Sequence, residues 1–387
     1  RLASVIRTTS ATATVVSMNG VDNQVCHLGF DATVTRSAGY FIDFATNAYR
    51  CSVRDVYLKA GFGGIHISDS TASIQVRATD IYDTVNTTGN SIVIDGGFAV
   101  LLDNVLCSVS GGGIVPNAHV LVNHCEDVVM SNCQFLTAVT PLLIQPTGAT
   151  KHLGELLSIN TQFDGATFQS VRIVPATSAY VARANFMNCW FGSVSGGSNF
   201  LATNAGGGTI DSITVAAGVF PGAGNGAGFD ITGCSNTILS NSKISAHAIG
   251  ASFNNCAKGI VSDNIIGAVD TGAVNTLGIN LIGTSDNFII DANVLTGNTT
   301  VITNTASGTK NRITNNLGYN DTNAILGITV GASPFTVPVK SYPRTLYLNS
   351  GTVSLVTING TGALQSSNHA IHLAPNHTMV VTYSVVP

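Results

Sequence analysis

Charge is the scarcest property of this 387-residue chain. Only 9 % of its residues are Asp, Glu, Lys or Arg, against about 25 % in ordinary domains, and the formal net charge is −4. The Lys and Arg residues are scattered singly, so the basic stripe of a nucleic-acid groove is absent and no nucleic-acid partner is expected. No apolar run approaches the roughly 18 residues that a membrane span requires, so no membrane-spanning segment is expected.

Other signals are missing as well. No C-x-x-C pair occurs among the eight cysteines, so we expect neither a zinc site nor any other metal or cofactor. No amphipathic helix of ten or more residues follows the opening segment. The chain begins at Arg1 without a signal peptide, and we expect that an N-terminal part is missing or was removed.

The chain contains one repeated sequence motif. Apolar residues alternate, a small residue or Cys marks a short turn, apolar pairs return, and Asn or Asp precedes a closing apolar residue. It is clearest in HVLVNHCEDVVMSNCQF (119–135), GFDITGCSNTILSNSKI (228–244) and GASFNNCAKGIVSDNII (250–266). The Asn/Asp position recurs at nearly regular intervals, with one double step, at Asp55, Asp80, Asn104, Asn132, Asn160, Asn188, Asn241, Asn264, Asn293 and Asn316.

A near-constant period with short alternating segments indicates a solenoid. None of the segments buries its apolar face alone, whereas coiling stacks each strand on its counterpart about 4.8 Å away. The pattern predicts an all-β fold, a right-handed parallel β-helix of about ten to eleven rungs over residues 25–317, with residues 1–24 as an N-terminal capping segment. The Asn column is expected to be structural, because stacked amides satisfy one another.

The glycine-rich stretch Asn204–Gly228 breaks the pattern and is expected to be an expanded loop. A second module is expected at 318–387, where the helical period ends. Five or six antiparallel strands with turns such as Asn359-Gly360 predict a small β-sandwich-like unit that caps the solenoid and mediates oligomerisation.

The eight cysteines are expected to be buried thiols stacked in the solenoid. Cys234 and Cys256 lie one rung apart and have the spacing to bridge if they are oxidised. Reduced thiols suit assembly in a cytoplasm.

The sequence resembles a known group of proteins. The rungs are similar to the pectate-lyase-like β-helix, and the order of β-helix and terminal β-module resembles bacteriophage tailspikes and related tail receptor-binding proteins. The stretches DATVTRSAGYFIDFATNAYRCSVRDVYL and GYN…ITVGASPF…LYLNSGTVSLVTING…LAPNHTMVVTYS carry this resemblance. It implies a homotrimer on a virion tail, assembled in the host cytoplasm. It also implies binding to host cell-surface polysaccharide, and attachment to other tail proteins through the missing N-terminal part.

Candidate chemistry centres on the only two glutamates, Glu126 and Glu155. Equal steps along the chain place Asp127, Glu155, Arg183 and Asp211 in one column, and His124, His152 and Tyr180 in a second column three residues earlier. Two carboxylates one rung apart suit a retaining glycosidase, with Asp127 as the acid and Glu155 as the nucleophile. The alternative is a solvated turn column without chemistry.

Two further positions attract attention. Trp190 is expected to stack with Phe135, Phe163 and Phe191 over successive rungs, either as core or inter-subunit packing or as a platform for a sugar ring. Asp83 occupies a position where other rungs place Phe, and is expected to be exposed or else functional.

Three functions therefore compete. The first is a tailspike that binds host polysaccharide and cleaves it as a depolymerase. The second is a structural or adhesive virion protein without catalysis, which the few carboxylates favour. The third is a secreted polysaccharide lyase or hydrolase, which the terminal module and the absence of an Asp-rich calcium cluster disfavour.

Overall fold

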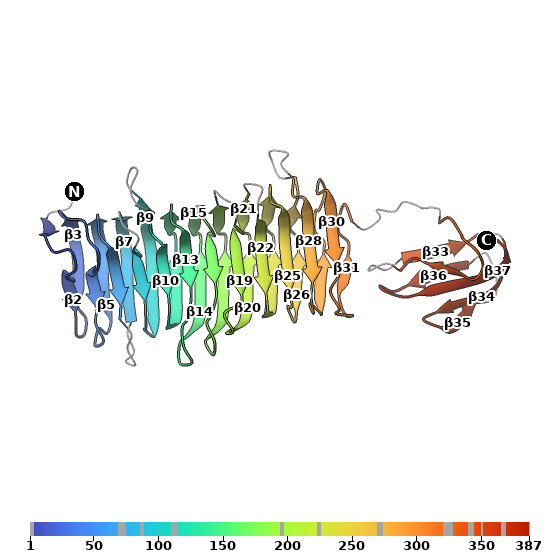
Figure 1. The fold of residues 1–387 in the computed structure, drawn as a ribbon, viewed down its shortest axis with the longest axis horizontal. Coiled ribbons are helices and arrows are strands. Elements are labelled where there is room, and N and C mark those ends of the chain that lie inside the picture. The colour runs from blue at the N-terminus through green and yellow to red at the C-terminus, as the bar shows by residue number, and fades with distance from the viewer. Residues whose placement is uncertain are drawn as a thin grey trace.

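The computed structural model describes residues 4–68, 75–85, 89–109, 115–193, 197–222, 226–268, 274–319, 328–339, 344–349, 351–364 and 369–386. These residues form strands and turns without a helix, which confirms the all-β prediction. Accordingly, no helical segment of membrane-spanning length and hydropathy occurs among them. The chain builds a long parallel β-helix followed by a small antiparallel β-module (Figure 1).

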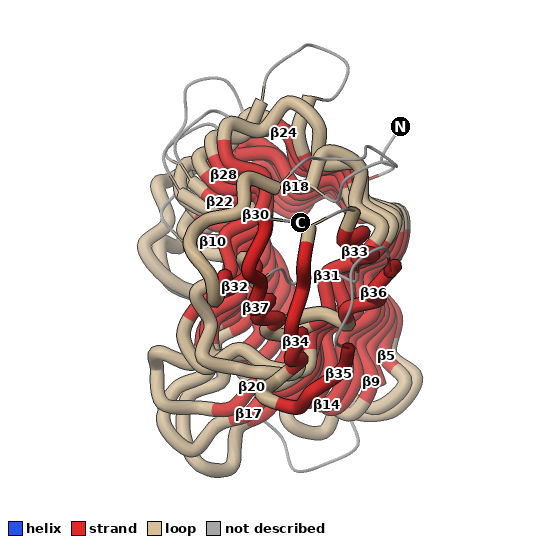
Figure 2. The backbone as a smooth tube through the Cα atoms, turned by 90° about the vertical axis from the view of Figure 1, so that its right-hand side faces the viewer, coloured by secondary structure: helices blue, strands red, loops and turns tan. Residues whose placement is uncertain are grey.

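Each coil of the β-helix contributes one strand to a 12-stranded parallel sheet and one or two to a 19-stranded parallel sheet. Seen from one end, the coils lie one behind another around a shared core (Figure 2). The 12-stranded sheet contains β2 (Val16–Met18), β4 (Tyr40–Phe44), β6 (Gly63–Ile67), β8 (Ile92–Ile94), β10 (Ala118–Val122), β13 (Thr140–Ile144), β16 (Val171–Ile173), β19 (Phe200–Thr203), β22 (Ala227–Thr232), β25 (Ile249–Asn254), β28 (Leu277–Ile282) and β30 (Thr300–Asn304). The 19-stranded sheet contains β1 (Ser4–Thr8), β3 (Gln24–Ala32), β5 (Cys51–Lys59), β7 (Gln75–Val85), β9 (Ala99–Val109), β11 (Cys125–Ser131), β12 (Gln134–Leu136), β14 (His152–Ile159), β15 (Gln162–Ala166), β17 (Tyr180–Met187), β18 (Trp190–Ser193), β20 (Thr209–Ala216), β21 (Val219–Pro221), β23 (Cys234–Ser240), β24 (Lys243–Ser245), β26 (Gly259–Ser262), β27 (Ile265–Ile266), β29 (Phe288–Asp291) and β31 (Arg312–Thr314).

The predicted parallel β-helix is therefore confirmed, and it is consistent with the pectate-lyase-like fold that the rungs resemble. The first strands come from the segment expected as a cap. There β1 pairs in parallel with β3, and β2 pairs in parallel with β4, so residues 4–18 extend both sheets by one strand.

Side chains at equivalent positions stack along the interior, as the repeat requires. Phe135, Phe163 and Phe191 are in register and fully buried. Their ring centroids lie 5.7 and 5.8 Å apart, and Phe220 continues the stack at 4.6 Å from Phe191. Stacked aromatic rings of this kind bury a large apolar area per coil and supply much of the driving force for folding.

The corner after β11, β14 and β17 is a residue in the left-handed conformation. Asn132, Asn160 and Asn188 have φ of 54°, 50° and 54°, a conformation that Asn tolerates better than most residues. In the next coil Ala217 takes the same conformation with φ of 55°, which explains the double step in the Asn series. The expectation of an expanded loop at 204–228 is therefore wrong, because β20, β21 and the start of β22 lie there and continue the coil.

The predicted Asn column proves to be two adjacent columns. Asn132, Asn160 and Asn188 occupy the corner itself and lie at the surface of the coil. Asn264, Asn293 and Asn316 come one residue after the corner, and each is only 1 % exposed. This inner column is the self-satisfying ladder: the Asn264 amide donates to Asn293 Oδ1 at 2.9 Å, and the Asn293 amide donates to Asn316 Oδ1 at 2.8 Å.

Cysteines occupy the same inner column in earlier coils. The Sγ of Cys133 and that of Cys189 donate to backbone carbonyls two residues before them, as the amide of Asn293 also does. Burial raises the pKa of the Cys133 thiol to about 12, so this thiol stays protonated and unreactive. All eight cysteines are free thiols, including Cys234 and Cys256.

The C-terminal module has its own sheets and its own core. Its strands are β32 (Phe335–Val337), β33 (Arg344–Leu348), β34 (Thr352–Ile358), β35 (Thr361–Leu364), β36 (His369–Leu373) and β37 (Met379–Val385). They pair antiparallel in a four-stranded sheet of order β32-β37-β34-β35 and a two-stranded sheet β33-β36, over a core that includes Val356, Met379 and Val381. The predicted turn at Asn359-Gly360 joins β34 to β35, with both residues at positive φ.

Candidate functional site

The carboxylate column lies on the outer face of the long sheet. Asp127 of β11 pairs in register with Glu155 of β14, which pairs with Arg183 of β17. The Arg183 guanidinium lies 3.2 Å from Glu155 Oε2, and the Asn185 amide donates to Glu155 Oε1 at 3.3 Å. Asp211 does not join the column, because Arg183 pairs with Ser212. The step to this coil is one residue longer than the step from Asp127 to Glu155 or from Glu155 to Arg183.

The second predicted column is also brought together. The rings of His124 and His152 lie edge to face with centroids 4.6 Å apart, and His152 stacks on Tyr180 at 4.7 Å with nearly parallel planes. His152 Nε2 hydrogen-bonds Glu126 Oε1 at 2.7 Å. The sequence analysis named Glu126 as one of the two glutamates of this region but assigned it no role in the site, and the structure shows it bound to His152.

Trp190 lies apart from the phenylalanine stack. It is 39 % exposed on the outer face of β18, in register with Gln162 of β15, which is in register with Gln134 of β12. Together with the corner amides these side chains line a groove of about 460 Å³, here termed the amide groove, whose lining is Asn132, Cys133, Gln134, Asn160, Thr161, Gln162, Asn188 and Trp190.

The amides of this groove are aligned in rows along the axis of the β-helix. The Asn188 side chain donates to Asn160 Oδ1 at 2.8 Å, and the Asn160 side chain donates to Asn132 Oδ1 at 3.3 Å. Because each primary amide has two N–H donors and an oxygen with two lone pairs, these bonds leave further donors and acceptors directed at solvent. The groove thus combines one exposed indole ring with five carboxamides.

A larger cleft of about 620 Å³ lies nearer the N-terminal end of the same sheet. Its lining includes Arg50, Arg54 and Arg77, the aliphatic residues Leu101 and Val129, and Asp127 of the carboxylate column. We term it the arginine cleft. Glu155 is not part of its lining, so only one of the two predicted carboxylates borders it.

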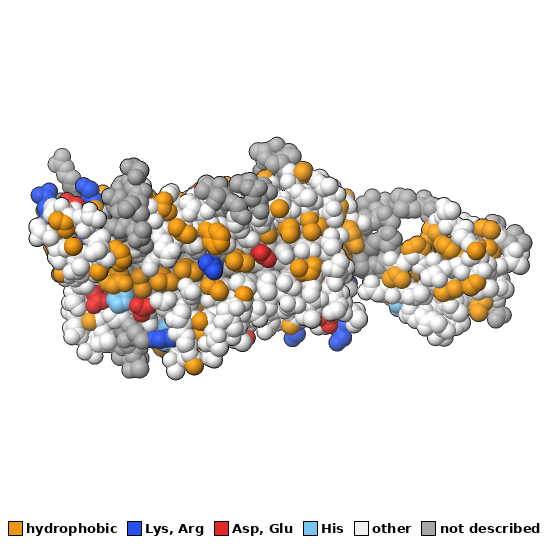
Figure 3. Space-filling model, viewed as in Figure 1, with side chains coloured by type: hydrophobic (Ala, Val, Ile, Leu, Met, Phe, Trp, Pro, Cys, Tyr) orange, Lys and Arg blue, Asp and Glu red, His pale blue; other side chains and the backbone are white. Residues whose placement is uncertain are grey.

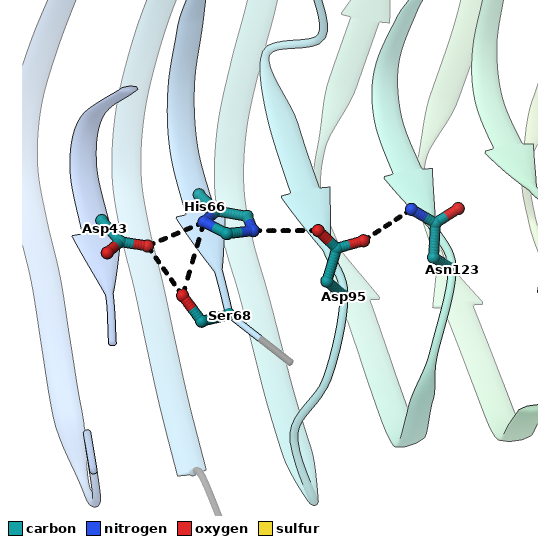
Figure 4. Close-up of polar contacts among 5 residues, drawn as sticks. All are labelled: Asp43, His66, Ser68, Asp95 and Asn123. Carbon is teal, nitrogen blue, oxygen red and sulfur yellow. Dashed lines mark hydrogen bonds and ion pairs between the residues drawn. The ribbon is translucent and has the colours of Figure 1, made fainter. Parts of the chain in front are cut away.

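A polar network on the 12-stranded sheet was not predicted (Figure 4). His66 lies between two carboxylates, with Nδ1 2.7 Å from Asp43 Oδ1 and Nε2 2.9 Å from Asp95 Oδ2. The two carboxylates raise the pKa of His66 to about 9 against the opposing effect of burial, so both ring nitrogens donate at neutral pH. Ser68 Oγ donates to Asp43, and the Asn123 amide donates to Asp95.

This network has the residue types of a Ser-His-Asp triad without its chemistry. A general base must accept the serine proton on a neutral imidazole, whereas Asp43 occupies the ring nitrogen nearest Ser68 and the imidazole is held protonated. The network ties neighbouring coils together. Asp43 and His66 are in register, whereas Asp95 lies two residues beyond Val93, the register partner of His66, so the repeat accounts only for the first pair.

Asp83 is not exposed, contrary to one of its two predicted readings. It is 1 % exposed, in register with Leu58 and Cys107 inside the core. Both carboxyl oxygens are buried and neither makes a well-formed hydrogen bond among the described residues; burial raises the pKa of Asp83 to about 7, against the smaller opposing effect of the nearby Ser91 hydroxyl.

On the face drawn in Figure 3, charged side chains are few among polar and apolar ones. No protein-family model and no curated protein sequence matches this chain. Its function is therefore argued from the grooves and columns described above.

Proposed function

We propose that this chain is a tailspike-type receptor-binding protein that attaches to a polysaccharide of the bacterial surface. The observation that carries the proposal is the amide groove, in which Trp190 stands beside rows of carboxamides on successive coils. An indole ring packs against the apolar face of a sugar ring, and carboxamides donate to and accept from its hydroxyl groups.

The repeat of the groove also favours a polymeric ligand. Asn132, Asn160 and Asn188 present the same group at each coil, about 4.8 Å apart along the axis. A linear chain of similar units can therefore make equivalent contacts on successive coils. The groove contains no charged side chain, which suits neutral, hydroxyl-rich portions of a glycan.

Hydrolysis is the second part of the proposal, and it is located at the carboxylate column. Asp127 would donate its proton to the glycosidic oxygen while Glu155 attacks the anomeric carbon, and water would then release the sugar from Glu155. His124, His152, Tyr180 and Arg183 would line and orient the sugar. The support is the register pairing of Asp127 with Glu155 on neighbouring strands.

The remaining parts of the proposal follow from the resemblance to tailspikes. The protein would form a homotrimer through residues 318–387, would join other tail proteins, and would reside in the virion tail after assembly in the host cytoplasm.

A non-catalytic, adhesive protein of the same fold is the second candidate. One specific observation favours it, namely that Asp127 borders the arginine cleft whereas Glu155 does not. In that case binding at the amide groove would be the whole function of the β-helix.

Binding is tested with the variant Trp190→Ala and the matched variant Phe168→Ala. Phe168 is 44 % exposed, comparable to Trp190 at 39 %, but lies outside the amide groove. Retention of each protein would be measured in gels that contain polysaccharides extracted from a panel of bacterial strains. We expect Trp190→Ala to lose at least tenfold in affinity and Phe168→Ala to behave as the parent; equal retention of all three proteins would refute the groove.

A further inference from the structure

The arginine cleft concentrates positive charge on a chain that has little charge elsewhere. Arg54 of β5 and Arg77 of β7 both point outward, and their register partners are Thr79 and Ser52 respectively. The two arginines therefore lie on adjacent strands, two residues apart along them, and both line the cleft. Arg50 also lines the cleft, but its guanidinium is paired with Asp22.

Among the described residues, none of the neighbouring carboxylates is paired with Arg54 or Arg77, and Asp127 is the one carboxylate in the lining of the cleft. Asp22 is bound to Arg50 at 2.7 Å, and Asp55 is bound to His27 at 2.6 Å. Asp80 accepts from the Asn104 amide at 2.7 Å, and Asp103 accepts from Ser131 Oγ at 2.5 Å. Within the part of the chain that the structure describes, Arg54 and Arg77 have no carboxylate within ion-pair distance.

The rest of the cleft is suited to an organic ligand rather than to a bare ion. Leu101 and Val129 are partly exposed and continue the register column of Arg77 across the next two strands, so they form an aliphatic floor beside it. Gln24, Ser52 and Thr79 provide neutral hydrogen-bonding groups around it. A volume of about 620 Å³ falls in the range of pockets that enclose small organic ligands, ~300–1,000 Å³.

We propose that the arginine cleft binds an anionic group, a carboxylate or a phosphate, carried by a saccharide. Guanidinium groups match the geometry of both anions and bind them through paired hydrogen bonds. The aliphatic floor takes the apolar face of the sugar, and the anion lies between Arg54 and Arg77. The saccharide part of this inference rests on the proposed function, whereas the anion part rests on the cleft alone.

The test uses the full chain and three small probes: glucuronate, glucose 6-phosphate and glucose. Saturation-transfer NMR would report binding of each probe to the parent protein, to the double variant Arg54→Gln/Arg77→Gln, and to Arg312→Gln. Arg312 is a matched control, because it is exposed on the outer face of the same sheet, in the register column of Arg77, near the other end of the β-helix. Thermal melting of each variant would confirm that it is folded.

We expect at least one anionic probe to give a several-fold stronger response than glucose with the parent. The double variant should lose that excess, and Arg312→Gln should keep it. A response to glucuronate alone assigns a uronic acid, a response to glucose 6-phosphate alone assigns a phosphorylated sugar, and a response to both assigns either anion. The inference is overturned if the stronger response to an anionic probe persists in the double variant or is lost in Arg312→Gln as well. It is also overturned if the parent responds to no anionic probe more strongly than to glucose.

The variant Trp190→Ala separates this result from the proposed function. It should keep the response to the anionic probe while losing retention by neutral polysaccharide, because the two grooves have no lining residue in common. If the arginine variants leave the response to the anionic probes unchanged while Trp190→Ala loses retention by polysaccharide, the amide groove is supported and the anionic site is not.

Discussion

The side-chain amide of Asn264 donates to Asn293 Oδ1 at 2.9 Å, and the same oxygen accepts the backbone N–H of Asn264 at 3.0 Å. The buried Oδ1 atoms of Asn293 and of Asn316 thus each accept from two donors of the coil before them. Asn293 in turn donates to the carbonyls of Val261 and Asp291 and to Asn316. The inner ladder therefore links three coils through side chains in addition to the backbone.

Asn293→Ala is expected to destabilise the β-helix strongly. The change leaves the donors of Asn264 and the acceptors around Asn293 without partners, at about 1–3 kcal/mol for each buried group. Thermal or denaturant unfolding would measure the loss. Asn160→Ala is the matched control, since Asn160 is exposed at the corner and water replaces its bonds; a similar loss in both variants would contradict the assignment of separate roles to the two columns.

The contribution of Asp83 to stability is expected to be smaller at neutral than at acidic pH. Its pKa is raised to about 7 in the folded chain, against about 3.9 when unfolded. The folded state thus holds its proton more tightly, and this stabilisation is lost as pH rises from 4 to 7, by roughly 4 kcal/mol in total. Asp83→Asn should remove this pH dependence from denaturant unfolding curves, and the exposed Asp211→Asn should retain it.

The raised pKa of His66 predicts that the stability of the fold declines further at alkaline pH. Its pKa of about 9 in the folded chain exceeds the unfolded value of about 6.5, so its stabilisation is complete below pH 6.5 and lost as pH rises through 9. Burial lowers the pKa of His119 and of His247 to about 4, so acid removes stability between pH 6.5 and 4. Stability should therefore peak near pH 6, and His66→Gln should flatten the curve between pH 6.5 and 9.

The predicted site residues that the structure brings together lie on successive coils of equal length. Asp127, Glu155 and Arg183 are in register for this reason, whereas the longer step to Ser212 removes Asp211. The early coils are shorter and unequal, as the pairings of Ser52 with Arg77 and of Arg77 with Leu101 demonstrate. A fixed period cannot align the arginines with Asp127 across such coils, and so the arginine cleft emerged only from the structure.

The direction of each side chain was the second element that the pattern did not reveal. A corner residue in the left-handed conformation reverses which residues face inward, so Trp190 lies outside and Phe191 inside, opposite to the alternation that continues from the buried Phe186. The same reversal places Asn188 in solvent and Cys189 in the core. Strand alternation alone predicts faces only between corners.

Trimerisation is expected to depend on residues 318–387. The four-stranded sheet of this module leaves β32 and β35 at its edges, and its core is small, so association would protect both. Multi-angle light scattering should find a trimer for the whole chain and a monomer or aggregates for a chain that ends at Asn316. A stable trimer of the shortened chain would show that the β-helix itself carries the interface.

Catalysis at the carboxylate column is expected to fail when either carboxylate becomes an amide. Glu155→Gln removes the nucleophile and Asp127→Asn removes the proton donor, so each should lower the rate of polysaccharide cleavage by about 100-fold or more. Both changes preserve the size of the side chain, and Asp211→Asn offers a control, since Asp211 is an exposed carboxylate one residue away from the column. Reducing-end release from host polysaccharide would measure cleavage, and gel retention would measure binding.

The two measurements together distinguish an enzyme from an adhesin. Loss of cleavage with unchanged retention in Glu155→Gln and Asp127→Asn, and normal cleavage by Asp211→Asn, would establish the column as the hydrolytic site. Cleavage that persists in the double variant would place the chemistry elsewhere. If the parent protein is retained by polysaccharides that the amide groove binds but cleaves none of them, the protein is the non-catalytic form. In that case Glu155 is not a nucleophile, and its contacts with Arg183 and Asn185 serve to connect neighbouring strands at the surface.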